Sequence, residues 1–219
     1  MVYDFHTHTV LSDGESIPIE VIRFSHVCGY GVIALTDHVS ASNLARIIDE
    51  LKRDCSIAVK NWDILAIPGV EISNVPRNEV KDLARKAKEL GARIVVVHGE
   101  SPIEDVEPGT NYEAVTCKYV DVLAHPGLIA EEELRLAREN NIFIELSSRK
   151  GHSMGNGHIA KYGLRAGVNF IVDSDSHKKE DLLLEGEQKK VILCAGLDKS
   201  LIHTITVDNP KLLLKKLGY

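Results

Sequence analysis

Short, almost continuously apolar runs recur along the chain, separated by longer segments of mixed polarity. The runs are rich in valine and isoleucine, which is typical of β-strands. They cover residues 2–6, 32–36, 64–67 continuing towards 71, 94–97, 120–124, 142–146 and 170–172. Because several runs lack any polar alternation, the pattern predicts strands whose two faces are both covered by helices.

Several of the segments between the runs have the spacing of amphipathic helices. The clearest cover residues 42–52, 78–90 and 130–140. Gly31, Gly91 and Gly167 stand just before predicted strands, where helix C-terminal caps belong. Pro210 followed by residues 211–217 predicts a closing helix with proline in its first turn. The alternation of strand and helix predicts an α/β fold with a parallel sheet, open or closed into a barrel, in one domain over residues 1–219.

Histidine, aspartate and glutamate residues stand at the carboxyl end of most predicted strands. His6 and His8 end the first run, and Asp175 and His177 follow the last. Because strand side chains alternate between faces, the members of each pair point to the same side. The other ligand-type residues at these ends are Asp13, His38, Glu71, His98 and His125. The two pairs meet only if the first and last strands become neighbours, so the pattern favours closure into a barrel.

The donor set consists of imidazoles and carboxylates without thiolates, which suits zinc, manganese or iron. The four cysteines are scattered and form no zinc-binding motif. The ligand-type side chains are too numerous for one ion, so we expect two or three divalent ions, with Glu71 suited to bridging two of them. Clustered ions activate a water molecule and hold the oxygens of a phosphoryl group.

This motif set resembles the polymerase and histidinol phosphatase (PHP) family. The matching motifs are His6-x-His8, Ser12-Asp13-Gly14, Thr36-Asp37-His38, Gly69-x-Glu71, His98, His125-Pro126-Gly127 and Asp173-Ser174-Asp175-Ser176-His177. The resemblance implies a distorted seven-stranded (β/α) barrel, similar to a TIM barrel, with a trinuclear metal site. Carried over by position, it assigns a first ion to His6, His8, Glu71 and Asp175, a second to Glu71, His98 and His125, and a third to Asp13, His38 and His177.

The resemblance also implies an enzyme that hydrolyses a phosphomonoester with a metal-activated water, such as histidinol phosphate or a small nucleotide. We expect catalytic roles for Asp175, His177 and Glu71, with Asp175 or a nearby histidine handling the proton of the leaving alcohol. One alternative is an amidohydrolase-type barrel acting on an amide or lactone, against which no lysine ends a strand. Another is a non-catalytic RNA-binding subunit related to a ribonuclease P protein, which would have lost these ligands.

Two long irregular segments, 100–112 and 147–158, follow strands, where loops commonly carry function. The second contains Arg149, Lys150 and His152, which we expect to contact the substrate. An arginine guanidinium matches two phosphate oxygens at once, so Arg149 is the leading candidate.

Two further acidic residues are expected to support the ligands rather than to bind metal. Asp37 stands next to His38 and is expected to orient it, and Glu145 lies within the sixth predicted strand, facing the barrel interior or a ligand.

Overall charge narrows the choice of partners. The chain has 26 basic and 32 acidic residues, a net charge of −6, and no run of lysine or arginine longer than two. This disfavours a protein whose main task is to grip a nucleic acid backbone. The expected partner is a small phosphorylated substrate, with nucleic acid entering only as a substrate end. No apolar stretch approaches the roughly 18 residues of a membrane span and no signal-peptide pattern opens the chain, so a cytoplasmic protein is expected.

Overall fold

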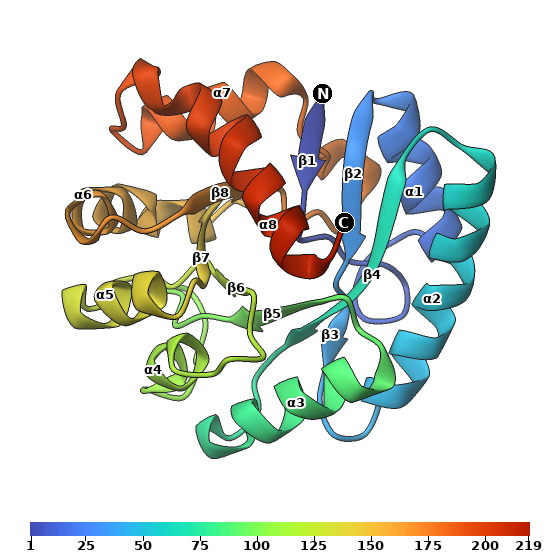
Figure 1. Cartoon of the computed structure of the whole chain (residues 1–219), viewed down its shortest axis with the longest axis horizontal. Coiled ribbons are helices and arrows are strands. Elements are labelled where there is room, and N and C mark those ends of the chain that lie inside the picture. The colour runs from blue at the N-terminus through green and yellow to red at the C-terminus, as the bar shows by residue number, and fades with distance from the viewer.

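The computed structural model describes residues 1–219 and shows a nearly closed barrel of parallel strands surrounded by helices (Figure 1). The strands follow the order β1-β2-β4-β5-β6-β7-β8, and the short β3 pairs with β4. The strands are β1 (Val2–Asp4), β2 (Tyr30–Leu35), β3 (His38–Val39), β4 (Leu65–Ile72), β5 (Ile94–His98), β6 (Val122–Ala124), β7 (Phe143–Ser147) and β8 (Phe170–Asp173). The helices are α1 (Pro18–Val27), α2 (Leu44–Asn61), α3 (Val80–Leu90), α4 (Thr110–Val115), α5 (Glu131–Glu139), α6 (Asn156–Ala166), α7 (Glu185–Cys194) and α8 (Asn209–Leu217).

The structure confirms the predicted α/β barrel and places a strand in every apolar run. The short β3 was not predicted, because β2 ends at Leu35 and the chain resumes strand pairing with β4 only at His38. The prediction for Gly31 was wrong: it lies within β2, and Gly29, with φ 81°, follows α1 instead. Gly91 and Gly167 do end α3 and α6 in the left-handed conformation.

The main differences from the predicted helices concern length. Helix α2 continues past residue 52 to Asn61, because Cys55 and Ala58 extend its buried face. The irregular segments are shorter than expected, since α4 begins at Thr110 and α6 at Asn156. No helix combines the length and the apolar character needed to cross a membrane.

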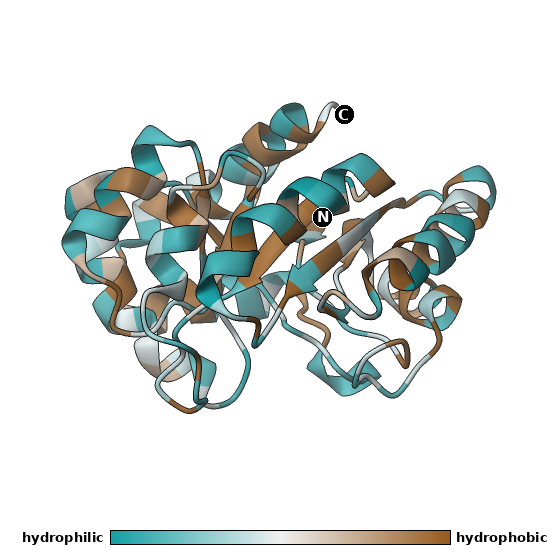
Figure 2. Ribbon diagram, turned by 90° about the horizontal axis from the view of Figure 1, so that it is seen from below, coloured by the Kyte–Doolittle hydropathy of each residue, from teal (hydrophilic) through white to brown (hydrophobic).

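Apolar side chains form two separate layers. The larger cluster of 47 buried residues lies between the sheet and the surrounding helices, and in Figure 2 these helices alternate brown and teal as amphipathic helices do. The smaller cluster of 13 buried residues fills the barrel interior and includes Phe5 and Phe143. Leu213 and Leu217 of α8 belong to this inner cluster. Helix α8 therefore seals the amino-terminal end of the barrel and leaves the carboxyl end of the strands as its open mouth.

The barrel closes where β1 meets β8, and ordinary strand pairing there is confined to the mouth. Just beyond the two strands, the Asp175 amide donates to the His6 carbonyl at 2.9 Å, and the His8 amide donates to the Ser176 carbonyl at 2.8 Å. Thr7 and Ser176 form an isolated parallel bridge. This short stretch of pairing brings the first and last ligand pairs side by side.

Side chains replace the missing ladder bonds along the rest of this seam. The Asp173 carboxylate accepts from the Phe5 amide at 2.7 Å, and the Asp4 carboxylate accepts from the Ser174 amide at 3.1 Å. From α7, the buried Gln188 amide group donates to the carbonyls of Tyr3 at 2.9 Å and Val172 at 3.2 Å. The seam thus satisfies its backbone groups with side chains that the strands or α7 provide.

We predict that Gln188→Leu lowers the free energy of unfolding by about 1–3 kcal/mol, because it leaves two buried carbonyls without a donor. Urea denaturation of the metal-free protein measures this. Lys189→Ala is the control, since Lys189 is next to Gln188 on α7 and forms only a surface ion pair with Glu185, so this variant should stay within about 1 kcal/mol of wild type. An unchanged Gln188→Leu protein would show that the seam does not depend on this side chain.

Candidate metal centre

Ligand-type side chains from opposite ends of the sequence converge at the barrel mouth. Glu71 lies in β4 and His98 ends β5, while His38 opens β3. The remaining members lie on the loops that follow the strands, namely His6, His8, Asp13, His125, Asp175 and His177. All are buried except Asp13, His38 and His177, which lie nearer the surface. Every residue that the sequence predicted as a metal ligand therefore lies in one cluster.

Glu71 occupies the centre of the cluster, surrounded by histidines. Its carboxylate lies 2.7 Å from His38 Nδ1 and 3.1 Å from His98 Nδ1. It also lies 3.3 Å from His6 Nε2, 3.6 Å from His8 Nε2 and 3.6 Å from His125 Nε2. The preceding Gly69 makes this depth possible, since a Cβ there would collide with Ile94 of the next strand. A carboxylate in this position can bridge two ions.

Many distances in the cluster are too long for hydrogen bonds and suit a shared ion. His125 Nε2 lies 3.7 Å and His6 Nε2 3.8 Å from the Asp175 carboxylate, and His8 Nε2 lies 3.6 Å from the Glu71 carboxylate. Two atoms bound to one zinc ion at about 2.1 Å in tetrahedral geometry lie roughly 3.4 Å apart. Direct hydrogen bonds from nitrogen are usually about 2.7–3.2 Å long. The spacing thus fits ligands arranged around ions.

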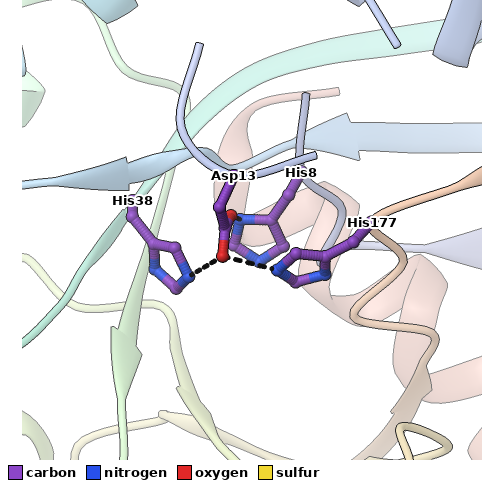
Figure 3. Close-up of side chains that lie close together, drawn as sticks. All are labelled: His8, Asp13, His38 and His177. Atoms are coloured by element: carbon purple, nitrogen blue, oxygen red, sulfur yellow. Dashed lines mark hydrogen bonds and ion pairs between the residues drawn. The ribbon is translucent and has the colours of Figure 1, made fainter. Parts of the chain in front are cut away.

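An outer group of the cluster gathers around Asp13 (Figure 3). The Asp13 carboxylate lies 3.1 Å from His177 Nε2, 3.6 Å from His38 Nε2 and 3.8 Å from His8 Nδ1. One ligand atom from each of these four residues can approach a common point. The grouping matches the third ion that the sequence resemblance implied, with His8 as an additional neighbour.

Two ligand histidines are held by carboxylates at the nitrogen that points away from the centre. Glu145 Oε2 lies 2.7 Å from His6 Nδ1, and Glu104 Oε2 lies 2.6 Å from His98 Nε2. A metal-binding histidine commonly donates its second N–H to a carboxylate, which fixes the tautomer and orients the ring. Glu145 therefore lies in the barrel interior in contact with His6, and its support of a metal ligand stays a prediction.

Charge is balanced within the cluster. Burial alone would raise the pKa of Glu71, but the surrounding histidines outweigh it and hold that pKa well below its usual range. Burial alone would lower the pKa values of His38 and His98, but Glu71 outweighs it and raises them to about 10 and about 9. Burial lowers the pKa of His8 to about 4 and that of His125 well below its usual value. His8 and His125 are therefore neutral imidazoles, the form that binds metal.

Unpaired buried atoms also fit a metal centre. Neither ring nitrogen of His125 has a hydrogen-bond partner, and His8 Nδ1 has none. Buried polar atoms normally do have partners. The backbone adds a second sign, since His125 and Asp175 adopt positive φ angles of 28° and 51°, which is costly for residues other than glycine. The residues thus fit two or more divalent ions of the zinc, manganese or iron type.

The three residues expected to contact substrate differ in how deeply they are buried. Arg149 is part-exposed, and its Nη1 donates to the Asp175 carbonyl at 3.0 Å and to His177 Nδ1 at 2.6 Å. Lys150 is exposed and lines, with Arg149, a cavity of about 740 Å³ beside the cluster. His152 is only 2% exposed and stacks on His125, so it lies among the ligands and not on an open loop.

The predicted role of Asp37 was wrong. Its carboxylate accepts hydrogen bonds from the Thr9 amide at 2.9 Å and the Ser12 hydroxyl at 2.7 Å. Asp37 therefore binds the loop after β1 and does not orient His38. The His38 ring instead contacts Glu71 and Ser73. Asp37 therefore holds the loop that carries Asp13.

Sequence reasoning missed Glu104 and Ser101, which contact His98 and His152 from the loop after β5. The sequence marks this loop only as a long segment that follows a strand. Nothing local distinguishes Glu104 from Glu100, Asp105 or Glu107 in the same loop. Asp4 and Asp173 were also missed, because their role at the seam exists only once β1 and β8 are neighbours.

No protein-family model matches the chain. The uncharacterized protein MJ1295 of Methanocaldococcus jannaschii is 43% identical over 218 residues, 99% of this chain and 100% of that protein. The DNA polymerase/3′-5′ exonuclease PolX of Bacillus subtilis is 24% identical over 82% of this chain and 35% of its own length. The 5′-3′ exoribonuclease Rnm of Escherichia coli is 35% identical over 36% of this chain and 25% of its own length.

Solved structures share the fold at low sequence identity. A chain of archaeal ribonuclease P with mature tRNA superposes with a TM-score of 0.74 and 15% identity, covering 98% of this chain and 91% of its own. The histidinol phosphate phosphatase of Lactococcus lactis, solved with zinc, L-histidinol and phosphate, superposes with a TM-score of 0.57 and 15% identity, covering 100% of this chain and 94% of its own. An amidohydrolase superposes with a TM-score of 0.61 and 12% identity, covering 98% of this chain and 74% of its own. These structural similarities support the barrel fold and do not by themselves indicate an activity.

Glu71→Gln should remove bound metal, because a neutral amide bridges two cations poorly. We expect the variant to lose at least one ion per chain in elemental analysis after dialysis against metal-free buffer. Glu89→Gln on the exposed part of α3 is the control and should keep the wild-type content. Full metal content in Glu71→Gln would show that Glu71 is peripheral.

Metal loading should release protons at neutral pH. His38 and His98, with pKa values raised to about 10 and about 9, carry protons in the metal-free protein, and only neutral imidazole binds a metal ion. The apparent zinc affinity should therefore rise as the pH rises from neutral towards the pKa of His98, about 9. Calorimetric titrations in buffers of different ionisation enthalpy count the released protons. Binding without proton release would contradict the charge balance described above.

Proposed function

The chain belongs to the family of the uncharacterized protein MJ1295, and we propose that it is a PHP-type, metal-dependent phosphoesterase that hydrolyses a phosphomonoester. The observation that carries the proposal is the position of Glu71, one buried carboxylate within 3.6 Å of ring nitrogens from His6, His8, His38, His98 and His125. An arrangement of this kind is suited to holding two ions close together.

When bound, the proposed ions would supply Lewis acidity, which lowers the pKa of a water molecule and neutralises phosphoryl oxygens. The chain's own residues supply position and proton handling. By the family resemblance, His6, His8, Glu71 and Asp175 would hold a first ion, Glu71, His98 and His125 a second, and Asp13, His38 and His177 a third. The geometry supports the first through the group of His6, His8 and Asp175, and the third through the group of His8, Asp13, His38 and His177.

Arg149 is placed to bind the phosphate at the edge of the cluster. Its Nε lies 3.6 Å from the Asp175 carboxylate, and its side chain is 32% exposed. A phosphate reaching the cluster from the cavity would therefore meet this guanidinium. On the same side, Asp175 or a nearby histidine such as His177 would pass a proton to the leaving alcohol.

The neighbouring cavity has room for the rest of a small substrate. Its volume is about 740 Å³, and its lining has basic side chains, Arg149, Lys150, Lys178 and Lys190, and acidic ones, Glu15, Glu180, Asp181 and Glu187. A small phosphorylated molecule, or the end of a nucleic acid strand, would fit a cavity of this size with its phosphate towards Arg149.

Two alternative functions, an amidohydrolase and an RNA-binding subunit, account for fewer features of the site. Amidohydrolase-type barrels share the fold, but no lysine belongs to the ligand groups at this mouth. A purely RNA-binding role is compatible with the ribonuclease P likeness, but it gives no reason for the buried ligands. Histidinol phosphate phosphatase is named for hydrolysis of a phosphomonoester, which supports the proposal, and PolX and Rnm are named as exonucleases, which cleave phosphodiesters and support only the broader phosphoesterase class.

The direct test is a substrate panel on protein loaded with zinc, manganese or iron. The panel contains histidinol phosphate, nucleoside monophosphates, nucleoside bisphosphates, short single strands with a 5′ phosphate, and lactone and amide controls. Release of inorganic phosphate that disappears on chelation supports the proposal. Turnover of only the lactones or amides would replace it with the amidohydrolase alternative.

Arg149→Ala should lower kcat/KM by roughly ten- to 150-fold, or ~1.5–3 kcal/mol, the scale of a hydrogen bond to a charged group. Metal content should stay unchanged, because arginine is not a metal ligand here. Arg149→Lys should recover only part of the loss, since an ammonium lacks the planar fork. Arg165→Ala on α6 is the control. Kinetics within about twofold of wild type would show that the phosphate is bound by other groups.

A further inference from the structure

His152 lies inside the barrel mouth although it belongs to a loop. It begins the short 3₁₀ turn His152–Gly155 after β7 and is only 2% exposed. Gly151, with φ 94°, turns the chain inward before it. After the turn, the Asn156 side chain donates to the Ser147 carbonyl at 2.8 Å and so ties the loop back to β7. The fold therefore holds this histidine in a fixed position.

The ring of His152 is held in the same manner as the rings of the ligand histidines. Its Nδ1 lies 2.7 Å from the Ser101 hydroxyl, as the His6 Nδ1 lies 2.7 Å from Glu145. In both residues one nitrogen is occupied by a supporting partner and Nε2 turns towards the cluster. This is the arrangement that fixes metal-binding histidines in proteins.

The free nitrogen faces two carboxylates at distances that leave space for an ion. His152 Nε2 lies 3.7 Å from Asp175 Oδ2 and 3.5 Å from Glu104 Oε1, both beyond ordinary hydrogen-bond length. The ring stacks on His125 with centroids 4.0 Å apart and planes 15° apart. One ligand atom from each of His125, His152 and Asp175 lies within 4.8 Å of the others.

We propose that His152 is a further metal ligand, which joins His125 at the second ion, of the zinc, manganese or iron type. Asp175 Oδ2 faces this position, while its Oδ1 faces His6 and His8 of the first ion. The residue comes from the loop after β7, a position outside the ligand motifs of the sequence. Glu104 closes the outer side of this position while also holding His98. The inference rests on the proposed metal centre and does not depend on phosphate esters being the substrate.

The test compares metal binding by His152→Phe with that of wild type. Phenylalanine keeps the flat ring against His125 and removes the nitrogen, so a packing role would be preserved and a ligand role lost. We expect His152→Phe to lose one ion per chain, or to bind it at least about tenfold more weakly. Elemental analysis after dialysis gives the content, and competition with a chromophoric chelator gives the affinity.

His158→Ala is the matched control, because His158 lies in the same segment and its Nε2 contacts the Ile129 carbonyl away from the cluster. It should keep the wild-type content and affinity. His152→Ala is the second variant, and thermal unfolding in chelator checks that each protein is folded. Cobalt(II) loading adds a spectroscopic readout, since loss of a nitrogen ligand changes the visible absorption bands.

The outcomes separate the two proposals. Wild-type content and affinity in both His152 variants, with unchanged cobalt spectra, would overturn the inference and leave the metal centre intact. A wild-type protein that binds no divalent ion would overturn the metal centre itself and this inference with it. Selective loss in the His152 variants supports the inference whatever substrate the enzyme hydrolyses.

Discussion

The pairing of residues 6–8 with residues 175–176 is the contact on which the rest of this structure depends. It joins the two ends of the sheet with only a few backbone hydrogen bonds, and it sets His6 and His8 beside Asp175. The remainder of the seam has no continuous ladder, so Asp4, Asp173 and Gln188 supply the missing donors and acceptors. The same short stretch of backbone pairing therefore closes the barrel and sets the geometry of the site.

Buried charge at the mouth imposes a second constraint. Burial raises the pKa of Asp4 to about 6 and that of Asp173 well above its usual range, which makes these seam carboxyls reluctant to ionise. Glu71 stays ionised, because histidines surround it on several sides. A protein without ions must therefore retain protons on some of these histidines, whereas bound cations would replace those protons. Metal binding, protonation and stability are linked through the same side chains.

The two sides of the mouth present different side chains to the cluster. Arg149 and Lys150 lie beside the cavity next to β7 and β8, while Glu104 reaches the cluster from the loop after β5. Arg149 contacts Asp175 and His177 on the first side, and Glu104 contacts His98 and His152 on the second. The cavity beside Arg149 also has carboxylates in its lining, namely those of Glu15, Glu180, Asp181 and Glu187.

The sequence by itself determined the order of strands and helices and the ligand-type residues at the strand ends, because apolar periodicity and the place of a histidine after a strand are local features. The family resemblance also grouped His6 with Asp175. Only the tertiary structure decided the depth of His152 and the contact of Glu104 with His98. Local pattern carries no information about which loop will fold over a site, since that choice depends on packing between elements that are distant in sequence.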